Sequence, residues 1–221
     1  MGADGIEIDV HRCATGEAVV IHDYSLERVA GVSLDVESTS LARLRSHDVG
    51  EGERIPLLEE ALEAAKGLFV NIELKVEKMT ATGLERVVAR VVEQAGARER
   101  VVFSCFHPAP LWRLRFLLPS VRRALLIGSS QAFHLRRGWQ GVALGLHAVH
   151  PEHVMLDECR LARFHRRGLE VNTWTVNEPW DIRRLSAMGV DGVITDRPDM
   201  ARDALMGMPA DRLELHPRLE D

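Results

Sequence analysis

The sequence lacks the features that mark membrane, secreted and disulfide-stabilised proteins. No apolar run approaches the roughly 20 residues that a membrane-spanning helix needs, and the N-terminus has no signal-peptide pattern. Only three cysteines occur among 221 residues, at Cys13, Cys105 and Cys159, without close metal-binding spacing. This low, odd count argues against a disulfide framework and indicates a reducing compartment. We therefore expect a soluble, cytoplasmic protein without an integral membrane segment.

An excess of positive charge and nucleotide-binding motifs are also missing. The chain carries 28 Lys and Arg against 33 Asp and Glu, a net charge of -5, whereas nucleic-acid-binding proteins usually present a basic face. Neither a Gly-x-Gly-x-x-Gly nor a phosphate-loop motif follows any predicted strand. These absences argue against a nucleic-acid partner and against a nucleotide-binding open sheet.

What the sequence does contain is a regular alternation of strand and helix signals in a chain that is 46% hydrophobic, enough to bury a sizeable core. The strands are predicted at 5–10, 19–21, 68–75, 101–104, 124–127, 148–150, 169–176 and 190–195, and the longer helices at 59–66, 80–95, 110–118, 156–167 and 179–188. Such alternation implies parallel strands joined by crossovers. Doubly wound sheets and the (β/α)8 barrel both satisfy it.

Polar residues favour the barrel because they recur where predicted strands end. They are Asp9, Glu73, Lys75, Ser104, Trp174, Asn177 and Asp196. In a barrel these strand ends converge on one mouth, where barrel enzymes keep their chemistry. We expect one barrel domain over 1–205, a polar insertion at about 24–54, and a C-terminal tail over 206–221.

The first predicted strand carries two carboxylates in an apolar context. Side chains alternate along a strand, so Glu7 and Asp9 share one face. Two adjacent carboxylates repel and are costly to bury unpaired, so this face is either solvated or binds a divalent cation through carboxylate oxygens. A second strand with Asn71, Glu73 and Lys75 on one face repeats the pattern, which favours the cation.

An ordered set of motifs resembles the glycerophosphodiester phosphodiesterase family over nearly the whole chain. The matching stretches are Gly2-Ala3-Asp4-Gly5-Ile6-Glu7-Ile8-Asp9-Val10, Val19-Val20-Ile21-His22-Asp23 with Leu26 and Arg28, Ile55-Pro56-Leu57-Leu58-Glu59-Glu60, Asn71-Ile72-Glu73-Leu74-Lys75, Phe103-Ser104-Cys105-Phe106, Trp174-Thr175-Val176-Asn177 and Gly189-Val190-Asp191-Gly192-Val193-Ile194-Thr195-Asp196-Arg197-Pro198. The resemblance implies a TIM barrel with a small insertion after the family's second strand.

The resemblance also implies roles for single residues. The carboxylates of Glu7, Asp9 and Glu73 would bind magnesium or calcium, His22 would act as a general acid or base, and Lys75 would neutralise the phosphate oxygens. Trp174 would pack on the glycerol or the leaving group. The implied reaction splits a glycerophosphodiester into glycerol 3-phosphate and an alcohol.

Each of these assignments has a structural alternative. His22 precedes an aspartate in a turn and could cap the hairpin, Lys75 could extend its ammonium to solvent, and Trp174 could belong to the core. His11 and Arg12 follow Asp9 closely, and we interpret both as surface residues.

The chain departs from the family pattern at its start. Family members begin with a strand carrying His-Arg-Gly, a Pro-Glu-Asn-Thr loop and a helix, whereas this sequence begins just before Gly2-Ala3-Asp4. The resemblance implies that the first strand and helix are absent, with a second catalytic histidine, an arginine and a further metal-site glutamate. We expect an impaired enzyme whose open barrel edge could support self-association. The alternative is a non-catalytic barrel remnant that binds a phosphate compound or a protein partner.

Overall fold

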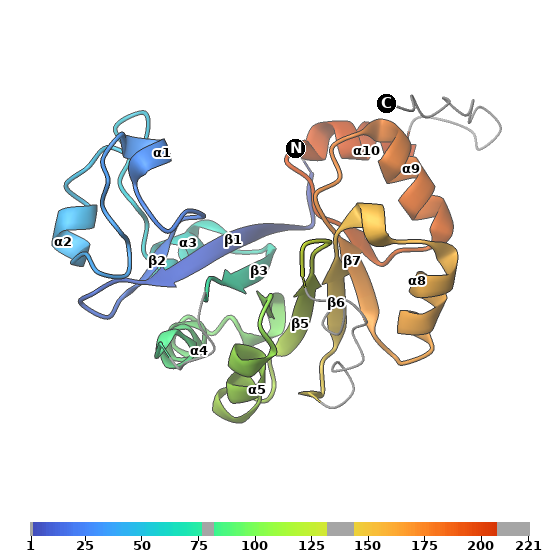
Figure 1. The fold of residues 1–221 in the computed structure, drawn as a ribbon, viewed down its shortest axis with the longest axis horizontal. Helices are drawn as coiled ribbons and strands as arrows, with labels where there is room; N and C mark the ends of the chain where they lie inside the picture. The colour runs from blue at the N-terminus through green and yellow to red at the C-terminus, as the bar shows by residue number, and fades with distance from the viewer. Residues whose placement is uncertain (1, 77–81, 132–143, 207–221) are drawn as a thin grey trace.

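Eight strands form one curled sheet in the computed structural model, which describes residues 2–76, 82–131 and 144–206 (Figure 1). The strands are β1 (Gly5–Arg12), β2 (Ala18–Val20), β3 (Phe69–Leu74), β4 (Val101–Cys105), β5 (Arg122–Ile127), β6 (Ala148–Pro151), β7 (Glu170–Thr173) and β8 (Gly192–Val193). The α-helices are α1 (Glu27–Ala30), α2 (Leu41–Leu44), α3 (Leu58–Ala64), α4 (Leu84–Gln94), α5 (Pro108–Leu117), α8 (Glu158–His165), α9 (Pro179–Met188) and α10 (Pro198–Met206). No helix in these ranges is both long and apolar enough to cross a bilayer.

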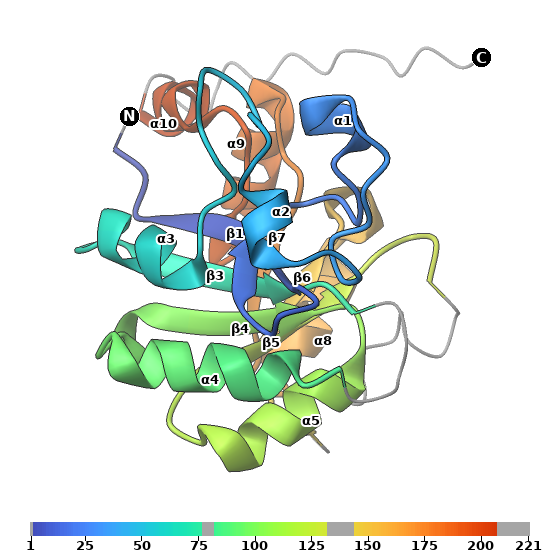
Figure 2. The ribbon, with the colours of Figure 1, turned by 90° about the vertical axis from the view of Figure 1, so that its left-hand side faces the viewer.

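The strand order is β2-β1-β3-β4-β5-β6-β7-β8, and every neighbouring pair except β1 with β2 runs parallel. Helices α4, α5 and α8 lie along the outer side of the curl (Figures 1 and 2). Within the described ranges β1 and β8 do not pair, so the sheet is an open half-barrel. The predicted α/β class is confirmed, and the predicted barrel is found as an open, curled, mostly parallel sheet. The absence of a first strand and helix stays a prediction.

The register of the sheet separates an apolar face from a polar one. Residues paired across neighbouring parallel strands point to the same face, and the pairs Ile72–Phe103 and Leu125–Val149 lie in the core beneath the helices. Glu73 and Ser104 directly follow Ile72 and Phe103 in their strands, so this pair points to the opposite face. The parallel sheet thus buries one face under helices and directs its polar side chains into the curl.

The insertion predicted at 24–54 forms a lobe that carries α1 and α2 (Figure 1). Its own small apolar cluster includes Leu26, Val36 and Leu44, all fully buried, together with side chains from the hairpin. The lobe therefore packs as a unit beside the hairpin. Of the tail predicted at 206–221, Met206 ends α10 and the remainder lies outside the described residues.

Several predicted boundaries shift because capping groups and pairing partners decide where elements end. The helix predicted at 156–167 begins later, where the Asp157 carboxylate accepts a hydrogen bond from the Arg160 amide at 2.7 Å. The strand predicted at 190–195 is wrong in its length, because only Gly192–Val193 pairs with β7. α9 matches its prediction and ends at Gly189, whose φ of 87° suits a residue without a side chain.

Candidate metal and phosphodiester site

The register between β1 and β3 brings the acidic side chains together. Glu7 lies opposite Asn71, and Asp9 lies opposite Glu73, in adjacent parallel strands. One carboxylate oxygen from each of Glu7, Asp9 and Glu73 lies within 4.8 Å of the other two. Three oxygens at this separation can reach a single cation, which is the arrangement that hard divalent metals prefer.

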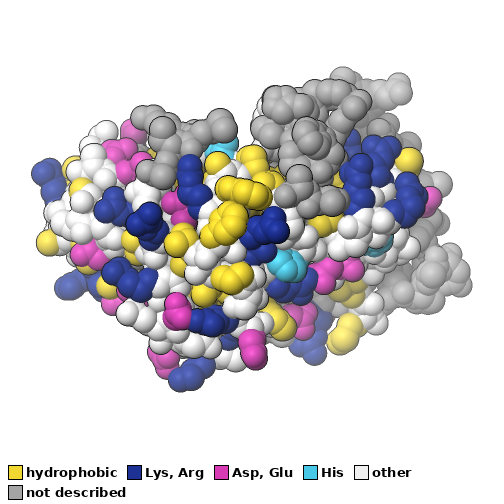
Figure 3. Space-filling view, turned by 90° about the horizontal axis from the view of Figure 1, so that it is seen from below, with side chains coloured by type: hydrophobic (Ala, Val, Ile, Leu, Met, Phe, Trp, Pro, Cys, Tyr) yellow, Lys and Arg dark blue, Asp and Glu magenta, His cyan; other side chains and the backbone are white. Residues whose placement is uncertain are grey.

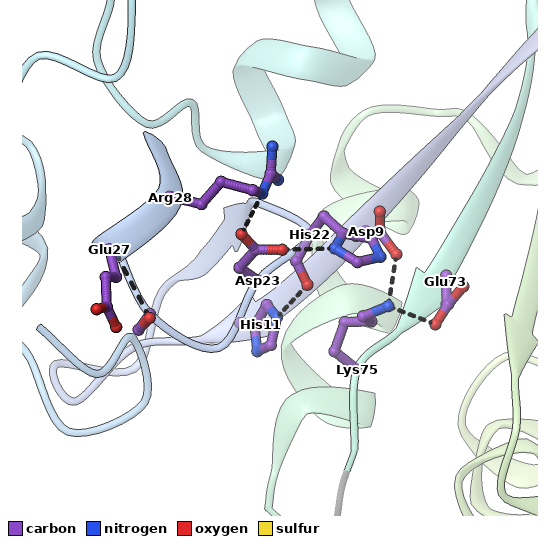
Figure 4. A network of polar contacts seen from close by, with 9 residues as sticks. Asp9, His11, His22, Asp23, Glu27, Arg28, Glu73 and Lys75 are labelled. Carbon is purple, nitrogen blue, oxygen red and sulfur yellow. Dashed lines mark hydrogen bonds and ion pairs between the residues drawn. The ribbon is translucent and has the colours of Figure 1, made fainter. Parts of the chain in front are cut away.

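Lys75 places its ammonium group between two of these carboxylates (Figure 4). Its Nζ lies 3.1 Å from Asp9 Oδ1 and 3.0 Å from Glu73 Oε1, and all three side chains are at most 13% exposed. Burial by itself would lower the pKa of Lys75, but the negative charges of Glu73 and Asp9 outweigh it, so the pKa is raised. Lys75 therefore stays charged and supplies one positive charge to the cluster.

The single positive charge of Lys75 is not enough to balance the three carboxylates. Burial, reinforced by Asp9 and then Glu73, raises the pKa of Glu7 to about 8, and burial also raises the pKa of Glu73 against the opposing effect of Lys75. The Oε1 atom of Glu7 is buried without a hydrogen-bond partner in the described part of the chain. A buried, unpartnered carboxyl oxygen beside two more carboxylates fits magnesium or calcium, because a divalent ion would replace the Glu7 proton and satisfy all three groups.

His22 stands on the loop after β2, beside the carboxylates (Figure 4). Its side chain is 66% exposed, and its Nδ1 lies 2.7 Å from Asp23 Oδ1. Arg28 Nε donates to the other Asp23 oxygen at 2.6 Å, and hydrogen bonds from Arg28 and then His22 lower the pKa of Asp23 to about 2. Asp23 is therefore an anion that can only accept, so His22 donates from Nδ1 and its Nε2 is available for proton transfer.

This geometry agrees with comparisons to known proteins. The model of the Glycerophosphoryl diester phosphodiesterase family matches residues 1–200 of this sequence. The chain belongs to this family. It is 30% identical over 210 residues to the glycerophosphodiester phosphodiesterase of Caldanaerobacter subterraneus, covering 90% of this chain and 84% of that protein.

Further members of the family show the same relationship. The chain is 30% identical over 212 residues to the glycerophosphodiester phosphodiesterase of Bacillus altitudinis, covering 90% of this chain and 85% of that protein. Among solved structures, an Oleispira antarctica phosphodiesterase in complex with the product sn-glycerol-3-phosphate superposes with a TM-score of 0.82 and 26% identity. That similarity covers 92% of this chain and 85% of the other.

In this member of the glycerophosphodiester phosphodiesterase family, Trp174 lies just after β7, apart from the three carboxylates. The strand pairings place it on the same face of the sheet as Glu73. It is partly exposed, its Nε1 donates to the His150 carbonyl at 2.7 Å, and its ring meets Phe106 edge-on with 5.6 Å between centroids. These two contacts hold the indole on the polar face of the sheet, at the end of β7.

One sequence interpretation is wrong: His11 is not a surface residue. It is fully buried, its ring packs edge-on against Tyr24 with 4.7 Å between centroids, and its Nε2 lies 3.4 Å from the His22 carbonyl. Burial lowers the pKa of His11 to about 4, so the ring is neutral and can donate from Nε2. Arg12 is partly buried, with Nη1 3.3 Å from the Thr82 carbonyl. His11 is thus a core residue, whereas Arg12 lies between core and surface.

Sequence reasoning also missed Asp23 as the partner of His22, and Arg28 as the partner of Asp23. Both stand in the matched motif, and the adjacent His22-Asp23 pair was the available signal. That signal was ambiguous because an aspartate after a histidine also suits a simple turn. The ion pair between Asp23 and Arg28 distinguishes the two, since it fixes the carboxylate that faces the imidazole.

Proposed function

We propose that this protein hydrolyses glycerophosphodiesters to glycerol 3-phosphate and an alcohol with the help of a bound magnesium or calcium ion. The observation that carries the proposal is the convergence of the Glu7, Asp9 and Glu73 oxygens beside the ammonium of Lys75. Three largely buried carboxylates beside one ammonium are unfavourable unless a metal ion binds them. A metal ion there would attract a phosphodiester. Family membership supplies the substrate class.

Glu7, Asp9 and Glu73 would hold the ion, which when bound supplies Lewis-acid polarisation of a phosphoryl oxygen. Lys75, a compact cation, would bind a non-bridging phosphate oxygen and stabilise the charge that develops there.

His22 would transfer a proton at the leaving or attacking oxygen through its Nε2 atom, while Asp23 holds the ring in place. Trp174 would pack against the glycerol or the alcohol from the end of β7.

We further propose that turnover is slow. Phosphodiester cleavage by acid–base chemistry uses one group to activate the nucleophile and another to protonate the leaving oxygen. Among the described residues beside the carboxylates, His22 is the exposed histidine, while His11 is buried and neutral. Loss of one such group typically lowers the rate about 100- to 10,000-fold.

The decisive experiment measures release of glycerol 3-phosphate from glycerophosphocholine with magnesium, with calcium and with a chelator. We expect slow, metal-dependent turnover that falls at least about 100-fold in Glu73→Gln and in His22→Ala. Glu59→Gln, an exposed glutamate on α3, is the matched control and should keep full activity.

Two results would contradict parts of the proposal. Turnover that survives His22→Ala would overturn the role of this histidine. Binding of inorganic phosphate or glycerol 3-phosphate without any turnover would favour a non-catalytic phosphate-binding protein.

Two further proposals concern the setting of the protein. A cytoplasmic location is supported by the three cysteines, all of them free thiols. Self-association is supported by the outer edges of β1 and β8. Within the described ranges the outer edge of β8 pairs with no strand, and that of β1 pairs only with the short strand β2. Ile6 on β1 is 38% exposed, and unpaired apolar strand edges tend to add further strands. Analytical ultracentrifugation over a range of concentrations tests this proposal.

A further inference from the structure

The outer side of helices α4 and α5 carries an exposed apolar cluster. Trp112, Phe116 and Leu117 of α5 are 43%, 67% and 40% exposed, and the two aromatic rings meet edge-on with 5.2 Å between centroids. Figure 3, which views the molecule from the side of α4 and α5 in Figure 1, shows hydrophobic side chains gathered near the middle of this face with basic and acidic side chains around them.

The fold does not account for this exposure. α5 already buries Leu111 and Leu114 against the core, and the helical repeat places Trp112 and Phe116 on the opposite side of the helix. Contiguous exposed apolar side chains on a monomeric protein commonly mark an interaction site. The cluster of Trp112, Phe116 and Leu117, called here the aromatic patch, therefore needs a partner.

Arginines surround the aromatic patch. Arg86 and Arg90 of α4 line a shallow groove that Leu117 closes from α5, and the guanidinium of Arg115 lies over the Trp112 ring at 5.5 Å. All three arginines are exposed, and within the described ranges none of them forms an ion pair.

The acidic groups of this region are already neutralised. Glu93, the acidic residue of the groove, pairs with Arg98, and Glu85 pairs with Arg113 at 2.6 Å. The rim of the aromatic patch is thus locally positive although the chain carries a net charge of -5. A partner for this surface must offer an apolar region into which the aromatic side chains can insert, and negative charge beside it.

We propose that the aromatic patch and its arginine rim dock this protein on an anionic lipid bilayer. Tryptophan and phenylalanine insert at the boundary between headgroups and acyl chains, and arginines beside them bind lipid phosphates. Basic residues near an anionic surface add an electrostatic attraction that salt screens.

A second copy of the chain fits this surface less well. A twofold contact would place the patch against itself and bring the arginines of the two copies together without an unpaired acid. The proposal is independent of the metal site, because the patch lies on the helix-covered side of the sheet and the carboxylates lie on the other.

The test is co-sedimentation of the full chain with vesicles of phosphatidylcholine alone or with added phosphatidylserine. We expect binding to the anionic vesicles that weakens at high salt and falls about tenfold or more in Arg86→Glu with Arg90→Glu. Trp112→Ala with Phe116→Ala should lower binding to a similar degree. Arg86 and Arg90 are exposed and unpaired in the described structure, so the charge variant should fold normally.

Matched controls separate this surface from general charge and hydrophobicity. Trp180 on α9 is 38% exposed, and Arg166 and Arg167 are exposed after α8. Trp180→Ala, and Arg166→Glu with Arg167→Glu, should leave vesicle binding unchanged.

The proposal is overturned if both vesicle types bind equally or not at all, or if the control variants lose as much binding as the patch variants. It is also overturned if the wild type is a dimer that Trp112→Ala with Phe116→Ala converts to monomer, because a second copy would then cover the patch. Vesicle binding needs no turnover, so its failure is distinct from failure of the phosphodiesterase assignment.

Discussion

Two regions on the same face of the sheet handle buried polar groups in opposite ways. Between β1 and β3, three carboxylates converge and Lys75 pairs with two of them, while Glu7 keeps a buried oxygen without a partner in the described structure. Between β6 and β7 the polar groups are neutral: Asn172 Nδ2 lies 3.2 Å from His150 Nε2, and the Trp174 indole donates to the His150 carbonyl.

The difference indicates which of the two regions binds a ligand. The β6–β7 region also keeps one buried atom without a partner in the described structure, His150 Nδ1. It carries no charge, however, because burial lowers the pKa of His150 to about 4. The β1–β3 region retains charge that its own residues do not balance. A stable fold tolerates that imbalance when a cation or a substrate group completes it.

The largest stability effect should come from removing Lys75. Without metal, Lys75→Met leaves Asp9 and Glu73 buried without their cation, and we expect a loss of about 3 kcal/mol in the free energy of unfolding. Added magnesium or calcium should restore most of it. Urea denaturation with and without a chelator measures both quantities.

The neutral region supplies the matched control for Lys75→Met. Asn172→Leu should cost about 1–2 kcal/mol, and no metal should restore it. Equal losses with equal metal responses in the two variants would remove the distinction between the two regions.

The next largest effect is competition between protons and the metal ion for the carboxyl group of Glu7. Because the pKa of Glu7 is about 8 without metal, a cation that binds at pH 6 must displace a proton, so apparent affinity should rise about tenfold per pH unit up to pH 8 and then level off. By the same shift, the metal-free fold loses stability as the pH rises from 4.5 towards 8. Calorimetric titration with magnesium at several pH values measures this, and Glu7→Gln should flatten the profile.

A smaller effect of opposite sign belongs to His150. Its pKa is about 4 in the fold and about 6.5 in the unfolded chain, so the unfolded chain binds the extra proton between these values. Stability should be full above pH 6.5, fall steadily as the pH drops towards 4, and then level off. His150→Asn should reduce the slope in chemical denaturation, leaving the remainder to His11 and His147, whose pKa values burial also lowers.

The smallest effect should follow from Asp23→Asn. Loss of the anion that orients His22 should lower kcat about tenfold with little change in KM, because the exposed ring keeps its place beside the carboxylates but not its orientation. Glu27→Gln on the neighbouring helix is the control and should not change kcat. An unchanged kcat in Asp23→Asn would mean that solvent alone orients the imidazole.

Strand periodicity predicted a large part of the candidate site. The alternation of Glu7 with Asp9, and of Asn71, Glu73 and Lys75, assigns each set to one face of its strand without further information, because side chains of a strand repeat every second residue. Periodicity could not predict that His11 is buried, since its burial depends on Tyr24 in the insertion. Nor could it orient α5, whose sequence Pro-Ala-Pro-Leu-Trp-Arg-Leu-Arg-Phe-Leu is apolar on several sides.

The sequence by itself determined the family, the alternating α/β pattern and the residue types available for the chemistry. The tertiary structure decided which of those residues meet, by pairing Asp9 with Glu73 across two parallel strands and placing Lys75 between them. It also decided that the rings of Trp112 and Phe116 face outward. The physical reason is that strand periodicity is a local property of the backbone, whereas register, burial and the balance of charge arise only when distant segments pack together.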